Sequence, residues 1–231
     1  MKNLQGLSII IPSFNENINL IRLIDYIKKF HLPLYEIIVV EGGTDFQIKN
    51  NFKPHREVKV INYDKGRAKQ LNKGAKTAKF DWLYFLHSDC VPPKNFKEII
   101  YKSMDNKNQA SCFKLKFNPS NFLLSLSAKA TKYNNIFCRG GDQSLLIHKS
   151  LFFLCDGYDE EYKVCEDINL IKKIYKLGEF KIMEGYIITD SRRFLKNGTL
   201  ILLIHFGIIH LLHYLKLSPK FLYSYYRLFI K

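Results

Sequence analysis

Short runs of large apolar residues alternate with helical patterns over the first hundred residues of the chain. Four runs rich in apolar residues, at 7–11, 35–40, 58–61 and 82–86, predict strands. The run at 82–86 is continuously apolar, which is typical of a strand buried on both faces. Apolar side chains spaced for one buried face predict helices near residues 18–27, 68–78 and 92–104. Repeated strand–helix units predict right-handed crossovers and a mostly parallel central sheet flanked by helices, which is the α/β class.

The second half of the chain is less regular. It contains predicted strands at residues 110–117, 143–148 and 180–189, and predicted helices at residues 122–133 and 166–177. Residues 134–142 are predicted to form a loop. The character of the sequence changes sharply at Thr199, so we place a domain boundary at about residue 195. Residues 1–195 then form the main domain, and residues 196–231 form a C-terminal amphipathic helical appendage.

The appendage is dominated by an almost uncharged segment from Leu200 to Leu217. At about 100° per residue, a helix here would carry one narrow polar stripe. The stripe consists of Thr199, His205, His210, His213 and Lys216. The segment is barely long enough to span a bilayer. Three arrangements remain open: packing on the main domain, a homodimer contact, or a helix in a membrane interface beside the basic, aromatic residues 220–231.

The composition limits the classes of molecule that the protein is expected to bind. The net charge of +15 attracts anions, which include nucleic acid, acidic lipid headgroups and phosphorylated small molecules. The lysines are scattered, and no zinc-finger, homeodomain or RNA-recognition signature occurs, which disfavours nucleic acid. Five cysteines without a CxxC pair indicate a reducing interior rather than a disulfide framework or a zinc site. We expect a cytoplasmic protein. If the C-terminal helix contacts lipid, we expect the protein to lie on the inner face of a membrane.

Polar or glycine-rich sequence follows each of the first four predicted strands. Because the carboxyl ends of parallel strands meet at one edge of a sheet, these endings would converge there, as in a nucleotide site. Glu41, followed by Gly42, could accept hydrogen bonds from a base or ribose, and Arg67 at a helix start could hold phosphate. GxGxxG and Walker sequences are absent, which argues against dinucleotide enzymes and P-loop ATPases.

Two acidic positions are candidates for chemistry. Asp89 follows the fourth strand, where it could bind Mg²⁺ or Mn²⁺ beside substrate phosphates; the alternative is a helix cap. Glu166 and Asp167 open a predicted helix, where acidic residues favour the helix dipole. The functional interpretation is a general base that deprotonates an acceptor hydroxyl, with Asp167 preferred.

Five ordered segments together resemble the family-two glycosyltransferases. They are Ile9-Ile10-Ile11-Pro12-Ser13-Phe14-Asn15-Glu16, Val40-Glu41-Gly42-Gly43, Gly66-Arg67-Ala68-Lys69-Gln70-Leu71-Asn72, Phe85-Leu86-His87-Ser88-Asp89 and Glu166-Asp167-Ile168-Asn169-Leu170. With Gly141-Asp142-Gln143, the resemblance is closest to a small subgroup labelled arsenosugar-biosynthesis glycosyltransferases. It implies the GT-A fold, a Rossmann-like nucleotide half at about residues 1–108 joined to an acceptor half at about 109–195.

The resemblance also implies roles for individual residues. The positions expected around the donor nucleotide and its diphosphate are Pro12, Glu16, Glu41, Gly42, Arg67, His87, Arg192 and Arg193. Asp89 matches the metal-binding aspartate, and Asp167 matches the catalytic base, with Glu166 beside it. Two departures stand out: the loop that begins at Glu41 is one residue shorter than usual, and His87 replaces the first aspartate of Asp-x-Asp.

The implied function is transfer of a sugar from a nucleotide-diphospho-sugar to an unknown acceptor hydroxyl, assisted by Mg²⁺ or Mn²⁺ and with inversion. Two alternatives belong to other classes. One is a nucleotide-sugar-binding or membrane-surface-binding module without catalysis. The other is a nucleotidyltransferase of related fold, whose glycine-rich, lysine-containing N-terminal loop this chain lacks.

Overall fold

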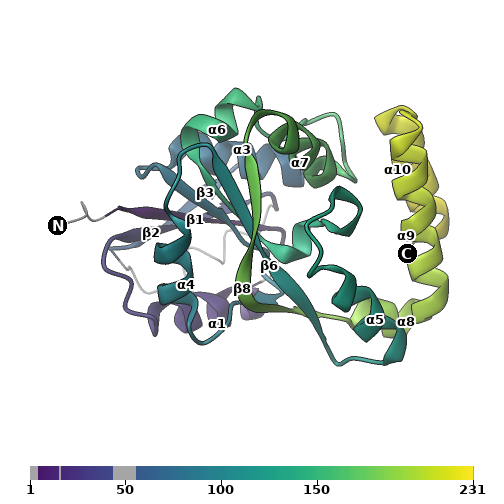
Figure 1. Ribbon diagram of the computed structural model, residues 1–231, viewed down its shortest axis with the longest axis horizontal. Coiled ribbons are helices and arrows are strands. Elements are labelled where there is room, and N and C mark those ends of the chain that lie inside the picture. The colour runs from purple at the N-terminus through teal and green to yellow at the C-terminus, as the bar shows by residue number, and fades with distance from the viewer. Residues whose placement is uncertain (1–4, 16, 44–55, 231) are drawn as a thin grey trace.

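A computed structural model describes residues 5–15, 17–43 and 56–230. Within these residues, eight strands form one sheet in the order β3-β2-β1-β4-β7-β6-β8-β5, and helices cover both of its faces (Figure 1). The strands are β1 (Leu7–Ser13), β2 (Tyr35–Glu41), β3 (Val58–Asn62), β4 (Trp82–Phe85), β5 (Cys90–Val91), β6 (Gln109–Asn118), β7 (Leu145–His148) and β8 (Glu179–Asp190). The predicted α/β architecture is confirmed.

The sheet has a parallel half and a mixed half. β3, β2, β1 and β4 run parallel to one another, so their carboxyl ends lie at one edge. β7 then pairs antiparallel with both β4 and β6, and β6 runs parallel to β8. The first four strands therefore bring the polar endings identified in the sequence to the same edge of the molecule.

Some helices cover the two faces of the sheet, and the last helices of the chain stand at one side of the molecule. They are α1 (Asn17–Lys28), α3 (Arg67–Thr77), α4 (Phe96–Ser103), α5 (Phe122–Ala130), α6 (Lys149–Leu154), α7 (Glu166–Leu177), α8 (Arg192–Asn197), α9 (Thr199–Tyr214) and α10 (Pro219–Phe229). Alternation along β1 explains the two layers, because Ile9 packs with α1 and α4 while Ile10 packs with α3, α6 and α7.

The structure corrects several predicted elements. The helix expected from Pro92 begins at Phe96, since the backbone N–H of Phe96 closes a turn on the carbonyl of Pro93. The predicted loop at residues 134–142 contains two 3₁₀ turns, Ile136–Cys138 and Gly141–Gln143. β5 and α6 were not predicted at all. Within the predicted helical appendage, residues 219–229 form a second helix, α10.

The C-terminal helices form a separate layer at one side of the molecule. α9 and α10 make a hairpin that stands beside the main body (Figure 1). The predicted boundary at residue 195 falls inside α8. In the part of the chain that the structure describes, no helix is both long enough and apolar enough to cross a bilayer.

Gly74 allows α3 to approach the sheet closely. A methyl group at this position would collide with Cγ2 of the fully buried Ile10 in β1. Gly207 in α9 is the matched contrast, because it is exposed and a methyl group there would meet nothing within 4 Å.

We therefore expect Gly74→Ala to lower the free energy of unfolding by about 1–3 kcal/mol through overpacking. Gly207→Ala should raise it by up to about 1 kcal/mol through helix propensity. Urea unfolding monitored by circular dichroism measures both values. A Gly74→Ala protein as stable as the wild type would contradict this packing argument.

Candidate functional site

Arg67 links three elements at the carboxyl edge of the sheet. It is the first residue of α3, and its Nε lies 3.2 Å from Oε1 of Glu166 at the start of α7. Its Nη2 contacts the ring of His87, which follows β4. His87 Nδ1 in turn lies 3.3 Å from Oδ1 of Asp142. The structure thus brings together Arg67, His87 and Glu166, which are far apart in the sequence.

Gly141 marks the centre of this arrangement. A side-chain carbon built on Gly141 would lie 2.9 Å from Oδ2 of Asp167 and 2.9 Å from Cε1 of His87, and it would collide with the guanidinium of Arg67. The backbone of the 3₁₀ turn Gly141–Gln143 therefore lies directly against the three side chains. Glycine is needed at this position because of the close approach.

The two acidic residues at the start of α7 have different environments. Glu166 is buried and paired with Arg67. Burial raises its pKa, with the charge of Asp167 adding to the shift and that of Arg67 opposing it. Asp167 is partly exposed and lines both neighbouring cavities. Of the two carboxylates, that of Asp167 is therefore the one accessible to a molecule in these cavities.

Asp89 and the backbone of Asp142 both lie beside Cys90. Cys90 Sγ is 3.5 Å from Oδ1 of Asp89 and 3.5 Å from the backbone oxygen of Asp142. Asp89 itself is exposed and lines a second cavity of about 350 Å³, together with Asp190. Potential metal-ligating atoms of His87, Cys90 and Asp142 lie within 4.8 Å of one another. Asp142, which the sequence did not single out as a ligand, thus joins His87 as a nearby donor.

Glu41 is buried at the end of β2. Its Oε1 accepts hydrogen bonds from the backbone N–H groups of Asn15, at 3.1 Å, and Gly43, at 2.7 Å. Its Oε2 is buried and has no hydrogen-bond partner among the described residues. An unpaired buried carboxylate oxygen is costly, so this atom is a candidate acceptor for a ligand donor group.

Two other predicted nucleotide contacts, Pro12 and Gly42, lie near Glu41. Pro12 is paired with Val40 in the β1–β2 register, and Gly42 donates a backbone hydrogen bond to Ser13. Glu16 falls outside the described residues, and so do Thr44 and Asp45, which come after Gly43.

Two further residues of α3 hold the edge together. Gln70 Nε2 donates to the carbonyls of Ser13, at 2.6 Å, and Val40, at 2.7 Å, and so joins the ends of β1 and β2. Asn72 exchanges hydrogen bonds with the backbone of Tyr158, at 2.8 and 2.9 Å. Both residues belong to the segment at residues 66–72 that resembles the glycosyltransferases, but no role was predicted for them. The sequence signal for such a role was their position in the same predicted helix as Arg67.

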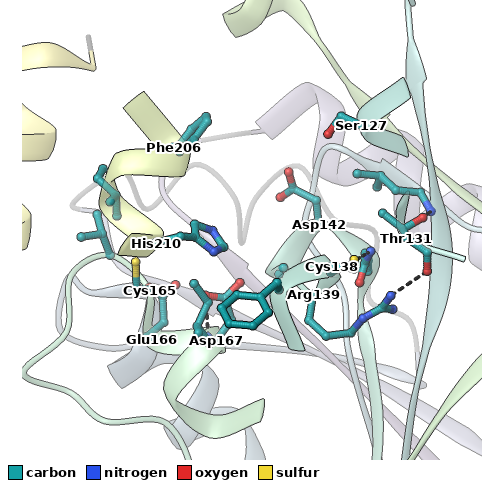
Figure 2. A pocket seen from close by; sticks show the side chains of 18 of the residues that line it. Ser127, Thr131, Cys138, Arg139, Asp142, Cys165, Glu166, Asp167, Phe206 and His210 are labelled. Carbon is teal, nitrogen blue, oxygen red and sulfur yellow. Dashed lines mark hydrogen bonds between the residues drawn. The ribbon is translucent and has the colours of Figure 1, made fainter. Parts of the chain in front are cut away.

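A chamber of about 410 Å³ opens beside Asp167 (Figure 2). One side comes from the main domain and includes Arg67, Asp142 and Asp167. The other side comes from the C-terminal helices and includes Phe206 and His210 of α9. His210 projects from α9 into this space (Figure 2), and burial lowers its pKa. The predicted appendage therefore supplies one wall of the chamber.

The structure separates the two arginines that were predicted to act as a pair. Arg192 Nε lies 2.5 Å from Oδ2 of Asp190. Arg193 lines the chamber, donates a hydrogen bond to the hydroxyl of Tyr226, and lies near the rings of Phe206 and Tyr226. Only Arg193 of the pair therefore faces the chamber.

Comparison with known proteins identifies a family match. Residues 8–157, nearly two thirds of the chain, match the Glycosyl transferase family 2 model. An uncharacterized glycosyltransferase of Haemophilus influenzae is 24% identical over 186 residues, which cover 75% of this chain and 63% of that protein. The chain thus spans less than two thirds of that relative.

Solved structures show the same fold at low sequence identity. The mannosyltransferase PcManGT from Pyrobaculum calidifontis, in complex with GDP-Man and Mn²⁺, has a TM-score of 0.62 at 14% identity, over 79% of this chain and 56% of that one. TarS 1–349 of S. aureus has a TM-score of 0.60 at 18% identity, over 80% of this chain and 58% of that one. The predicted GT-A fold is confirmed.

The docking of α9 should make stability depend on pH. His213 is buried beside Lys172, whose Nζ lies 3.1 Å from its Nδ1. Burial and then the charge of Lys172 lower the pKa of His213 to about 4. The unfolded chain binds this proton near pH 6.5, so the stabilising contribution is complete above pH 6.5 and is lost as the pH falls toward 4.

We expect the wild type to lose about 3 kcal/mol of unfolding free energy from this group between pH 7 and pH 4. His213→Gln should lack that part of the pH dependence. His31→Gln, at an exposed position, should keep it. Urea unfolding at a series of pH values measures the effect, and parallel profiles for the wild type and His213→Gln would refute it.

Proposed function

The chain belongs to glycosyl transferase family 2, and we propose that it moves a sugar from a nucleotide-diphospho-sugar to an acceptor hydroxyl with inversion at the anomeric carbon. The observation that carries the proposal is the position of Asp167. This carboxylate lies next to His87 and Arg67 at the carboxyl edge of the sheet, and it faces a chamber large enough for a sugar-sized molecule. Parallel α/β sheets bind ligands at that edge.

The donor nucleotide would bind where β1 and β2 end. Glu41 Oε2, buried without a partner among the described residues, offers an acceptor for a base or ribose donor group. Gln70 holds the two strand ends in register beneath it. Pro12 and Gly42 shape the same edge. Glu16 keeps its role here as a prediction.

The residues around Cys90 offer donors for a divalent cation. His87 and Asp142 bring an imidazole nitrogen and a carboxylate oxygen into one cluster with Cys90 Sγ, and Asp89, whose Oδ1 lies 3.5 Å from that sulfur, offers a second carboxylate. Carboxylate and imidazole donors suit Mg²⁺ or Mn²⁺, and Asp89 would be the principal ligand. A bound cation would supply charge neutralisation for the departing diphosphate.

Asp167 would act as the base in the transfer. Its carboxylate takes the proton of the acceptor hydroxyl as that oxygen bonds to the anomeric carbon, and the bond from that carbon to the diphosphate oxygen breaks. Attack from the face opposite the leaving group inverts the configuration. Glu166 holds Arg67 in place, and Arg193 adds positive charge at the chamber wall. The narrower resemblance to the arsenosugar subgroup stays a prediction.

Asp167→Asn should reduce turnover by about 10²–10⁴-fold, because a general base contributes that much. Binding of nucleoside diphosphates should be unchanged, since the donor side of the site is intact. A screen of nucleotide-sugars by thermal shift identifies a donor, and release of nucleoside diphosphate then measures turnover. Asp156→Asn, an 82% exposed position paired with Lys173, is the matched control and should keep full activity.

Retained turnover in Asp167→Asn would overturn the assignment of the base. A wild type that binds nucleotide-sugars without transfer would support the non-catalytic module instead. Release of pyrophosphate from a nucleoside triphosphate would support the nucleotidyltransferase.

Removing the cation should weaken nucleoside diphosphate binding. We expect calorimetry to show at least about tenfold weaker binding in EDTA than with Mn²⁺, since one lost charge-assisted contact is worth 1.5–3 kcal/mol. Asp89→Asn should bind equally in both conditions, whereas Asp64→Asn, at an exposed ion pair with Lys69, should behave like the wild type. Equal binding by the wild type with and without Mn²⁺ would remove the metal from the proposal.

A further inference from the structure

Four of the five residues of the polar stripe, Thr199, His205, His210 and His213, lie in α9 and face the protein, whereas Lys216 follows the helix and is exposed. Thr199 Oγ1 accepts a hydrogen bond from Asn121 at 2.8 Å, and His205 Nδ1 lies 2.8 Å from the hydroxyl of Tyr225 in α10. His213 contacts Lys172, and His210 enters the chamber. All four side chains of the helix stripe therefore have internal surroundings, which is the reverse of an ordinary surface helix.

The opposite side of α9 is apolar and exposed to solvent. At about 100° per residue, its exposed apolar side chains fall within one arc of roughly 100°. They are Leu200, Ile201, Ile204 and Leu211, joined by Leu215 at the C-cap, and each is 52–60% exposed. Such a contiguous apolar surface on a charged protein marks an interaction site.

The neighbouring helix α10 carries exposed cations. Its exposed residues include Lys220 and Arg227 beside Phe221 and Leu228. Residues 191–231 contain seven Lys and Arg residues and no Asp or Glu. The hairpin forms an outer layer of the molecule, away from the sheet (Figure 1). Its surface is thus both apolar and exclusively positive in formal charge.

We propose that the α9–α10 hairpin docks onto the surface of an anionic lipid bilayer. Apolar side chains would enter the headgroup–acyl boundary while the flanking Lys and Arg residues contact acidic headgroups. A second copy of the chain is a poorer occupant, because a twofold contact would place two wholly cationic surfaces against each other. A bilayer matches both the apolar and the charged component.

Docking would also orient the chamber. Phe206 and His210 on the inner side of α9 line it, while Ile204 and Leu211 on the outer side would contact lipid. The chamber wall would then lie one helix diameter from the membrane. This geometry concerns binding alone, so it can be tested without any transfer activity.

The experiment is co-sedimentation of the full chain with vesicles of phosphatidylcholine alone and of phosphatidylcholine mixed with phosphatidylglycerol. We expect binding to the anionic vesicles that weakens as salt is raised. Ile204→Ser with Leu211→Ser should weaken the partition coefficient by roughly tenfold or more, given the transfer free energy of such side chains. Lys220→Gln with Arg227→Gln should weaken it by about tenfold or more, and only on anionic vesicles.

Two controls match these variants. Leu154→Ser changes a 60% exposed leucine of α6, and Lys94→Gln changes an exposed lysine before α4; both should bind as the wild type does. Thermal melts by circular dichroism check that each variant is folded. Absence of binding to anionic vesicles, or binding that the α9 and α10 variants leave unchanged, overturns the proposal. A dimer in analytical ultracentrifugation that Ile204→Ser with Leu211→Ser dissociates overturns it in favour of a second copy.

Discussion

The ion pair between Arg67 and Glu166 is the contact on which the site depends. Glu166 is buried at the start of α7, where an unpaired carboxylate would be strongly destabilising. Arg67 at the start of α3 compensates its charge at 3.2 Å. The requirement to pair this charge fixes the starts of two helices that lie on the same face of the sheet. The carboxylate of Asp167, whose Oδ1 accepts the backbone N–H of Ile168, follows one residue along α7 and lines the chamber.

The same helix α3 organises the rest of the edge. Three polar side chains within its first two turns reach three different segments: Arg67 reaches α7, Gln70 reaches the ends of β1 and β2, and Asn72 reaches the turn at Tyr158. Gly74 lets the helix lie close enough to the sheet for these contacts. The same short helix therefore both packs on the sheet and positions residues of the site, because successive side chains of a helix point in different directions.

Much of this fold could be predicted from the sequence because continuous apolar runs and helical periodicity are strong local signals. The limits of β1, β2 and α7 follow from them to within one or two residues. α6 was missed because it follows β7 without a break: His148 ends the strand, and its side chain accepts the N–H of Ser150 to cap the helix. The two-residue strand β5 has no periodicity to detect and exists because Cys90 pairs with Thr189, far along the chain.

Topology predicted that the segments after the first four strands, which include Arg67 and His87, meet at one edge of the sheet. Glu166 comes from a later helix, so its contact with Arg67 was not predicted. The partnership with Asp142 depends on a 3₁₀ turn that local patterns do not reveal. The orientation of α9 could not be predicted from local sequence patterns either. A helical wheel defines two faces without saying which one turns inward. Burying histidines costs free energy unless they find partners. Here Tyr225 contacts His205, Lys172 contacts His213, and Asn121 donates a hydrogen bond to Thr199 of the same stripe. Because those partners hold the polar side of α9 against the protein, the apolar side faces outward. The residues exposed on that side then decide what the helix can bind.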